Sequence, residues 1–119
     1  MEDKQRIKNL VKMIVKHIEE KHGDNVAVLD LQGISSMCDY FVISSASSER
    51  QIKAIADEIK GGLEKEGIVP GHVEGMREAR WILLDYGDII VHLFVQADRD
   101  HYGLETIWKD APVINVDTL

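Results

Sequence analysis

The sequence predicts an α+β (α/β) domain in which helices flank a mixed β-sheet of about five strands. The first observation is the order of the periodic segments, which reads α-β-β-α-β-β-β-α. Neighbouring strand segments favour a mixed sheet over a strictly alternating parallel one. The second observation is length, because 119 residues suffice for one core that buries roughly two thirds of the unfolded surface. The chain has no repeat and no internal linker, so we expect one domain over residues 1–119.

The first part of the chain reads as a helix followed by two strands. Apolar residues recur at helical spacing over residues 3–22, and Gly23 is placed to end that helix. Val26–Leu31 and Tyr40–Ser45 are rich in β-branched and aromatic residues, as strands are.

A second amphipathic helix begins after the second strand. Ser48 and Gln51 fit a capping box, in which Ser48 caps the helix and the Gln51 side chain reaches back. Gly67 suits the C-terminus of this helix. A short strand is predicted around His72–Glu74.

The segment Trp81–Val95 predicts a β-hairpin at the centre of the fold. Apolar residues occupy both alternating sets of positions, which indicates that both faces of the hairpin are covered. Asp98 is placed to cap a short helix that runs to about Lys109, and Pro112 ends it. The tail over residues 113–119 is predicted to be loosely held.

Composition and charge narrow the class of partner. Fourteen Lys and Arg against 21 Asp and Glu give a net charge of −7, and no basic run is present to neutralise phosphates, so direct nucleic-acid binding is not expected. An acidic domain is better matched to a basic protein. No apolar run reaches the ~18 residues of a membrane span, and the N-terminus lacks a signal-peptide core. Cys38 is the only cysteine, which favours a reducing compartment. We expect a cytoplasmic protein.

Metal-dependent nucleotidyl transfer is the first enzyme class to consider. Such enzymes hold two metal ions with carboxylates two residues apart, because alternate strand positions share one face. Asp39 opens a strand, but the position two residues later is Phe41, which cannot bind a metal. Asp30 and Asp85 would have to compensate from other strands. A metal-dependent nucleotidyltransferase or nucleotide-binding domain is kept as an alternative, and no cofactor or metal is expected.

Other catalytic arrangements are weaker. Cys38 could act as a nucleophile with His72 or His92 as base, but a lone cysteine before a strand is more often a small buried hydrophobe. The five histidines lack zinc spacing, and His92 is expected to be a hydrogen-bonded structural residue. The small-residue loop Ser44–Ser48 lacks the glycines and lysine of a phosphate-binding loop.

A group of aromatic and acidic residues suggests a docking site. Trp81 and Tyr86 lie at the start and in the turn of the hairpin, near Glu74, Asp85 and Asp88. Large aromatics with an acidic border are typical of a protein-binding hot spot. Composition and pattern therefore predict a small acidic, non-enzymatic domain that binds something basic.

The same segments resemble the iojap family, the ribosomal silencing factors. The similarity runs from about residue 5 to Pro112. It is carried by DLQGISSMCDYFVI (Asp30–Ile43), SERQIKAIAD (Ser48–Asp57), VEG (Val73–Gly75), WILLDYGDIIVHLF (Trp81–Phe94) and YGLETIW (Tyr102–Trp108).

The resemblance implies a non-enzymatic translation repressor. Members of the family bind the large ribosomal subunit through its ribosomal protein number fourteen, block joining of the small subunit and so damp translation under nutrient limitation. They are often homodimers. Their fold resembles that of nucleotidyltransferases without the catalytic metal pair. A large-subunit assembly factor using the same surface is an alternative that sequence does not separate from silencing.

Carried over by position, Trp81 is the expected interface anchor and Tyr86 supplements it by apolar contact. Glu74, Asp85 and Asp88 would face basic side chains of the ribosomal protein. The chain departs from the family pattern at two places. Many members have T-G-x-S where this chain has Ser45–Ser48, and the position of Tyr86 is often aliphatic.

Overall fold

The computed structural model describes residues 2–102 and 112–114. The elements, in chain order, are α1 (Glu2–Glu20), β1 (Asp24–Asp30), β2 (Tyr40–Ala46), α2 (Glu49–Glu64), β3 (His72–Glu74), β4 (Trp81–Asp85), β5 (Ile89–Val95), α3 (Gln96–Tyr102) and β6 (Val113–Ile114). The predicted order of helices and strands is confirmed, and β6 adds one strand to the five expected.

The strands form one open, mixed sheet with the order β3-β4-β5-β2-β1-β6. Only the central pair β2 and β5 is parallel, and the other four pairs are antiparallel. The parallel pair arises because the chain leaves β2 through α2 and returns through β3 and β4 before it reaches β5. The α+β fold class is thereby confirmed.

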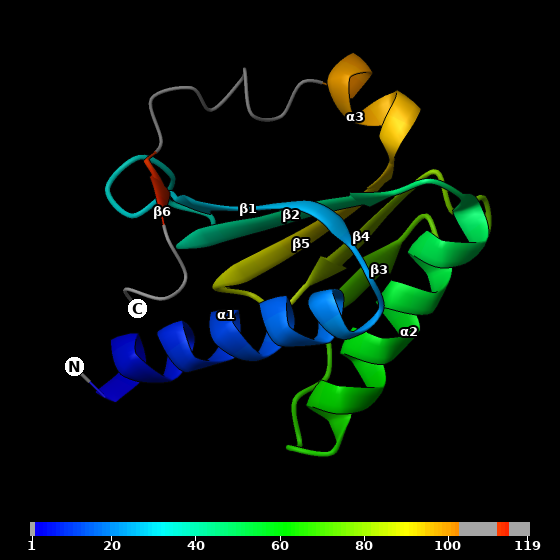
Figure 1. Ribbon diagram of the computed structural model, residues 1–119. Coiled ribbons are helices and arrows are strands. Elements are labelled where there is room, and N and C mark those ends of the chain that lie inside the picture. Colours follow the sequence, from blue (N-terminus) through cyan, green and yellow to red (C-terminus); the bar gives the residue numbers. More distant parts are fainter. Residues whose placement is uncertain (1, 103–111, 115–119) are drawn as a thin grey trace.

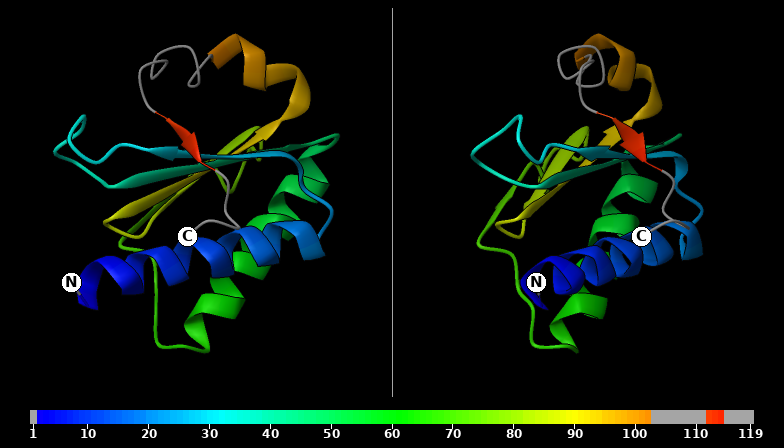
Figure 2. Two further views of the ribbon diagram at one scale, coloured as in Figure 1. Left: turned by 60° about the vertical axis from the view of Figure 1, so that its left-hand side comes forward. Right: turned by 90° about the vertical axis from the view of Figure 1, so that its left-hand side faces the viewer.

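The two faces of the sheet are covered differently. Helices α1 and α2 lie side by side against one face, while α3 lies on the other (Figures 1 and 2). We call the first the helix face and the other the second face. Along β5, Val91 and Leu93 point to the helix face, while Ile90 and Phe94 point to the second face.

The main core lies between the helix face and the two long helices. It contains fully buried residues of both helices, such as Ile14 and Ile59, together with Val42, Leu84 and Leu93 of the sheet. A smaller cluster lies on the second face and comprises Leu29, Leu31, Cys38, Phe41, Ile43 and Phe94. In β5 every residue except the half-buried Ile90 is buried, so the prediction that both faces of the hairpin are covered is confirmed for this strand. In β4, however, Trp81 and Leu83 are only half-buried on the second face.

The capping box is confirmed in one half and wrong in the other. Ser48 is the N-cap of α2, and its hydroxyl accepts a hydrogen bond from the Gln51 backbone N–H. The Gln51 side chain does not return to Ser48. Its amide donates instead to the backbone carbonyls of Lys21 and His22, at distances of 3.3 and 3.1 Å. These carbonyls lie just past the end of α1 and lack helical partners, so Gln51 satisfies them and ties α1 to the start of α2.

The prediction that Asp98 caps the last helix is wrong. Helix α3 begins at Gln96, directly after β5, and Asp98 lies in its first turn. The carboxylate of Asp98 accepts two hydrogen bonds from Arg80. The predicted continuation of this helix to Lys109 lies outside the described residues. The first two residues of the predicted tail form β6 on β1, and the rest of that tail also lies outside them.

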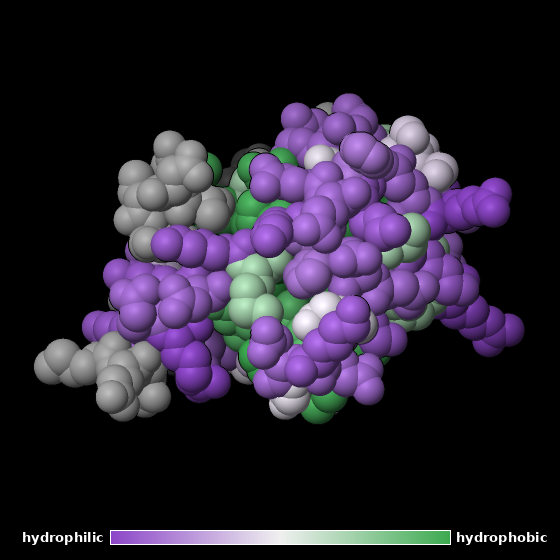
Figure 3. Space-filling view, turned by 60° about the horizontal axis from the view of Figure 1, so that its bottom comes forward, coloured by the Kyte–Doolittle hydropathy of each residue, from purple (hydrophilic) through white to green (hydrophobic). Residues whose placement is uncertain are grey.

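The surface on the side of the two long helices is mostly hydrophilic, with apolar surface showing in a hollow near its middle (Figure 3). Among the described residues, no helix combines the length and apolar character needed to cross a membrane.

Candidate docking site

The alternation of β4 places three of its residues on the second face. Trp81, Leu83 and Asp85 pair with Phe94, His92 and Ile90 of β5. In the same register Leu83 pairs with Glu74 and Asp85 with His72 of β3. Residues that pair across strands point to the same side. Three of the five predicted site residues, Glu74, Trp81 and Asp85, therefore share one face at the β3–β4 edge of the sheet.

Tyr86 does not join this group. Its ring packs against the main core of the helix face, whereas Trp81 packs against the small cluster of the second face. Burial raises the pKa of Tyr86 to about 12. Its buried hydroxyl has no hydrogen-bond partner among the residues that the structure describes. The structure thus places the two aromatics at opposite ends of β4 and on opposite faces, so Tyr86 is positioned as a core residue.

A shallow hollow of about 440 Å³ lies beside Trp81. It is lined by Glu74, Gly75, Glu78, Arg80, Trp81 and Leu83. Gly75 makes this arrangement possible, because its φ is +83° and a Cβ there would lie 1.9 Å from the carbonyl oxygen of Trp81. Only glycine tolerates such an approach. The V-E-G segment thus brings Glu74 and the following loop directly against the start of β4.

The indole of Trp81 is held from within the sheet. Its Nε1–H donates to Nδ1 of His92 over 3.1 Å, and its ring packs on Phe94 with 5.1 Å between centroids. His92 is 4% exposed, and burial lowers its pKa to about 4. The imidazole is therefore neutral at pH 7, and Nδ1 is free of a proton and able to accept. The prediction that His92 is a hydrogen-bonded structural residue is confirmed.

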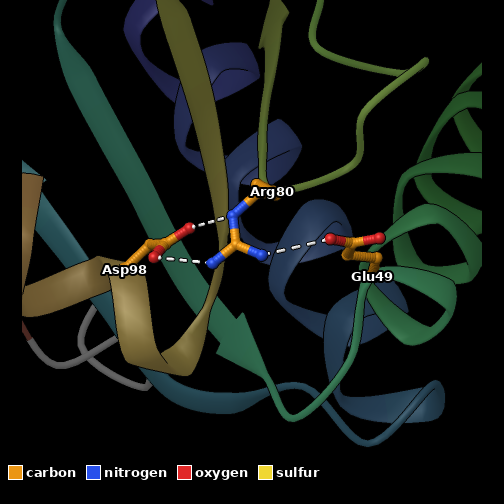
Figure 4. A network of polar contacts seen from close by, with 3 residues as sticks. All are labelled: Glu49, Arg80 and Asp98. Carbon is orange, nitrogen blue, oxygen red and sulfur yellow. Dashed lines mark hydrogen bonds and ion pairs between the residues drawn. The ribbon is translucent and has the colours of Figure 1, made fainter.

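Arg80, which lines the hollow, forms a polar network with one residue of α2 and one of α3 (Figure 4). Its guanidinium donates to both carboxylate oxygens of Asp98 in α3, over 2.7 and 2.9 Å. A third donor reaches Glu49 in the first turn of α2 over 3.2 Å. These contacts raise the pKa of Arg80. They fix Arg80 in place and offset its positive charge with two carboxylates.

The hairpin turn lies at the other end of β4, about 13 Å from Trp81 for four strand residues. Asp85 accepts from the Gly87 N–H over 2.8 Å, which shapes the turn. The carbonyl of exposed Asp88 accepts from the N–H groups of Asp39 and Tyr40. Carboxylates therefore gather around buried Cys38. Burial and the charges of Asp39, Asp85 and Asp88 raise the pKa of its thiol to about 11.

This end of the sheet does not assemble the alternative metal site. The Asp30 carboxylate accepts from the Gln32 N–H and that of Asp85 from the Gly87 N–H, so both shape turns. Within residues 2–102 and 112–114, Asp30, Asp39 and Asp85 do not converge on one position that could hold a metal ion. The raised pKa of Cys38 likewise keeps its thiol protonated and poorly nucleophilic at pH 7.

A separate group of three possible metal ligands lies between α1 and α2. His17, Glu20 and Glu58 have ligand atoms within 4.8 Å of one another. Nδ1 of His17 lies 2.8 Å from Glu58, so the pair joins α1 to α2.

Sequence reasoning missed three residues of the site region. Glu78 and Arg80 lie in the loop between β3 and β4. A loop has no regular repeat of apolar residues, so its sequence does not show which side chains are buried or which way they point. Arg99 is buried, and it donates to the Ser45 hydroxyl and to the Asn25 carbonyl, which holds α3 on the second face. The run of Glu78, Arg80 and Trp81 after Gly75 was the available signal, because charged residues beside an aromatic are typical of an interface rim.

Comparison with known proteins supports the resemblance. The chain matches the family described as "Ribosomal silencing factor during starvation" over residues 4–119. It is similar to the ribosomal silencing factor of Bacillus subtilis (strain 168), with 40% identity over 110 residues, or 92% of this chain and 93% of that protein. It is also similar to a Mus musculus protein named "Mitochondrial assembly of ribosomal large subunit protein 1", with 25% identity over 101 residues, or 82% of this chain and 44% of that protein.

The fold agrees with these similarities. A crystal structure of a protein from Bacillus halodurans has a TM-score of 0.81 with this chain at 36% identity, covering 90% of this chain and 97% of that one. The family match extends over nearly the whole sequence and includes every residue of the candidate docking site. This chain belongs to the family of ribosomal silencing factors.

Proposed function

We propose that this protein binds the large ribosomal subunit through its ribosomal protein number fourteen, and that it thereby blocks joining of the small subunit and damps translation under nutrient limitation. The family supports the ribosomal partner. The observation that carries the proposal is Trp81, a half-buried indole fixed by His92 and Phe94 at the rim of an acidic hollow.

The second face at the β3–β4 edge is suited to docking for a physical reason. An aromatic residue that is already held in place loses little side-chain entropy when a partner covers it, so more of the burial energy appears as affinity. Glu74 and Glu78 add negative charge, which speeds encounter with a basic protein. This mode of action needs no cofactor and no catalytic step, and it fits the cytoplasmic location expected for a ribosomal partner.

The test is cosedimentation of the protein with isolated large subunits. Trp81→Ala should weaken binding by more than ~1 kcal/mol, because truncation of a central aromatic anchor removes most of its contact area. The variant must first be shown to fold by circular dichroism and urea unfolding, since it also leaves His92 without its donor.

Val113→Ala is the matched control. Val113 is 68% exposed on β6, at the opposite edge of the sheet from β3, and its truncation should leave binding unchanged. Wild-type cosedimentation of a folded Trp81→Ala variant would show that Trp81 is not the anchor.

A role in large-subunit assembly is the second candidate. The mouse relative carries that function in its name, and both roles can use the same surface. A subunit-joining assay separates them. A silencing factor added to mature large subunits should reduce formation of the joined ribosome, and Trp81→Ala should relieve that block. An assembly factor should bind without changing subunit joining.

A further inference from the structure

We propose that the hollow beside Trp81 is a pocket for one guanidinium group, filled by an arginine side chain of the basic partner. The source of the arginine rests on the proposed function. The ability of the pocket to bind a guanidinium group does not depend on it. It concerns the residues that line the hollow: Glu74, Gly75, Glu78, Arg80, Trp81 and Leu83.

The charges around the hollow favour a cation. Glu74 and Glu78 are exposed carboxylates on its wall, and Glu74 also lies 3.2 Å from Nε2 of the exposed His72. Arg80 is the one basic residue among its lining, and it is already bound to Asp98 and Glu49. The charge of Arg80 is thus offset by Asp98 and Glu49, and the lining of the hollow holds no further basic residue to balance Glu74 and Glu78. A second cation would restore the balance of charge, and an anion would meet repulsion.

The shape and polarity of the wall favour guanidinium over ammonium. Guanidinium is planar, stacks on indole rings and binds carboxylates through two parallel hydrogen bonds, whereas ammonium is a strongly hydrated point charge. Trp81 supplies an indole and Leu83 an apolar surface for the methylene stem. The volume of about 440 Å³ lies near the lower end of the roughly 300–1,000 Å³ of small-ligand sites, so one long side chain fits.

The fixed indole is part of the pocket. The indole N–H already donates to His92. Trp81 can therefore be covered by a partner that offers no hydrogen-bond acceptor for it. Gly75 holds the neighbouring loop against the Trp81 backbone, so Glu74 and the indole keep their relative positions before any ligand arrives. A pocket organised in advance loses little entropy on binding.

The experiment is an NMR titration of the ¹⁵N-labelled full chain with N-acetyl-argininamide, read at the indole N–H of Trp81. Comparison with a Trp81→Phe spectrum assigns that resonance. We expect a saturable shift with the arginine probe, and a shift at least threefold smaller with the equivalent citrulline amide, which has the same shape without the charge. Equal shifts with the two probes, or no saturable shift, would overturn the proposal.

Charge-neutral variants locate the effect. Glu74→Gln and Glu78→Gln should each weaken binding of the arginine probe by about threefold or more. Glu66→Gln, an exposed carboxylate in the loop after α2, is the matched control and should change nothing. A double Glu74→Gln, Glu78→Gln variant that binds the probe like wild type rejects the pocket.

Cosedimentation with large subunits separates this proposal from the proposed function. Loss of subunit binding in Trp81→Ala with wild-type binding in the double glutamine variant would support docking and reject the arginine pocket. Charge-dependent probe binding without any subunit binding would support the pocket and reject the proposed function. Loss of binding in both assays for the double variant is the outcome we expect.

Discussion

The two faces of the sheet differ in how completely this chain covers them. On the helix face, Leu84 and its neighbours are fully buried beneath α1 and α2, and the cluster is almost wholly apolar. On the second face the core is small, and it includes buried His92 and half-buried Trp81 and Leu83 at the β3–β4 edge. The larger apolar cluster on the helix face supplies most of the folding energy, so the second face can keep polar and exposed groups at little cost in stability.

The largest contrast is expected from two neighbours on β4. Leu84→Ala removes a fully buried side chain of the main core and should lower the free energy of unfolding by about 2–5 kcal/mol. Leu83→Ala truncates a half-buried side chain on the second face and should cost less than about 1 kcal/mol. Urea unfolding followed by circular dichroism measures both. Equal losses would show that the two faces contribute alike to stability.

The next contrast compares two glycines with positive φ. Gly75→Ala forces a Cβ against the Trp81 carbonyl and should lower the free energy of unfolding by at least about 2 kcal/mol. Gly87 has a φ of +87° with nothing within 4 Å of an added Cβ, so Gly87→Ala should cost only about 1 kcal/mol. Thermal and urea unfolding measure both variants. A mild effect of Gly75→Ala would mean that the loop beside the hollow can move away.

Acid should weaken the fold through the second face. The pKa of His92 is lowered from 6.5 to about 4, so the unfolded chain binds this proton more tightly than the folded one. The contribution of His92 is complete above pH 6.5 and is lost as the pH falls from 6.5 towards 4. Between pH 7.5 and 5 the loss is roughly 2 kcal/mol.

His92→Asn tests this dependence, because an asparagine oxygen can still accept from the Trp81 indole but does not titrate. The variant should lose less stability than wild type between pH 7.5 and 5 in urea unfolding. His22→Gln, which removes an exposed histidine, is the control and should follow wild type. An unchanged acid response in His92→Asn would mean that another group controls it.

The smallest effect is expected at Tyr86. Its buried hydroxyl lacks a partner among the described residues, so Tyr86→Phe removes a polar group that folding has desolvated. The free energy of unfolding should stay the same or rise by up to about 1 kcal/mol. Large-subunit binding should also be unchanged, since Tyr86 faces the main core. Weaker subunit binding with unchanged stability would return Tyr86 to the docking site.

Local signals in the sequence determined the elements. Helical spacing of apolar residues located α1 and α2, and β-branched runs located β1, β2 and the β4–β5 hairpin, because these periodicities follow from backbone geometry alone. The Ser48 cap was also readable, because its hydrogen bond joins residues three apart. Trp81 was identified by residue type, and the family was identified from motifs along the chain.

Tertiary structure decided which of these residues meet. Gln51 and Asp98 were predicted to satisfy backbone groups of their own helices. In the structure, Gln51 binds the segment after α1, and Asp98 binds Arg80. Both partners are far away in sequence, so the local periodicity gives no signal for these contacts. Alternation alone puts Trp81 and Tyr86 on opposite faces, because they are five residues apart, but only the packed sheet shows which face the helices cover. The hollow needs β3, β4 and the loop between them together. Sequence alone thus determined the elements and the family, whereas packing of distant segments decided the geometry of the candidate docking site.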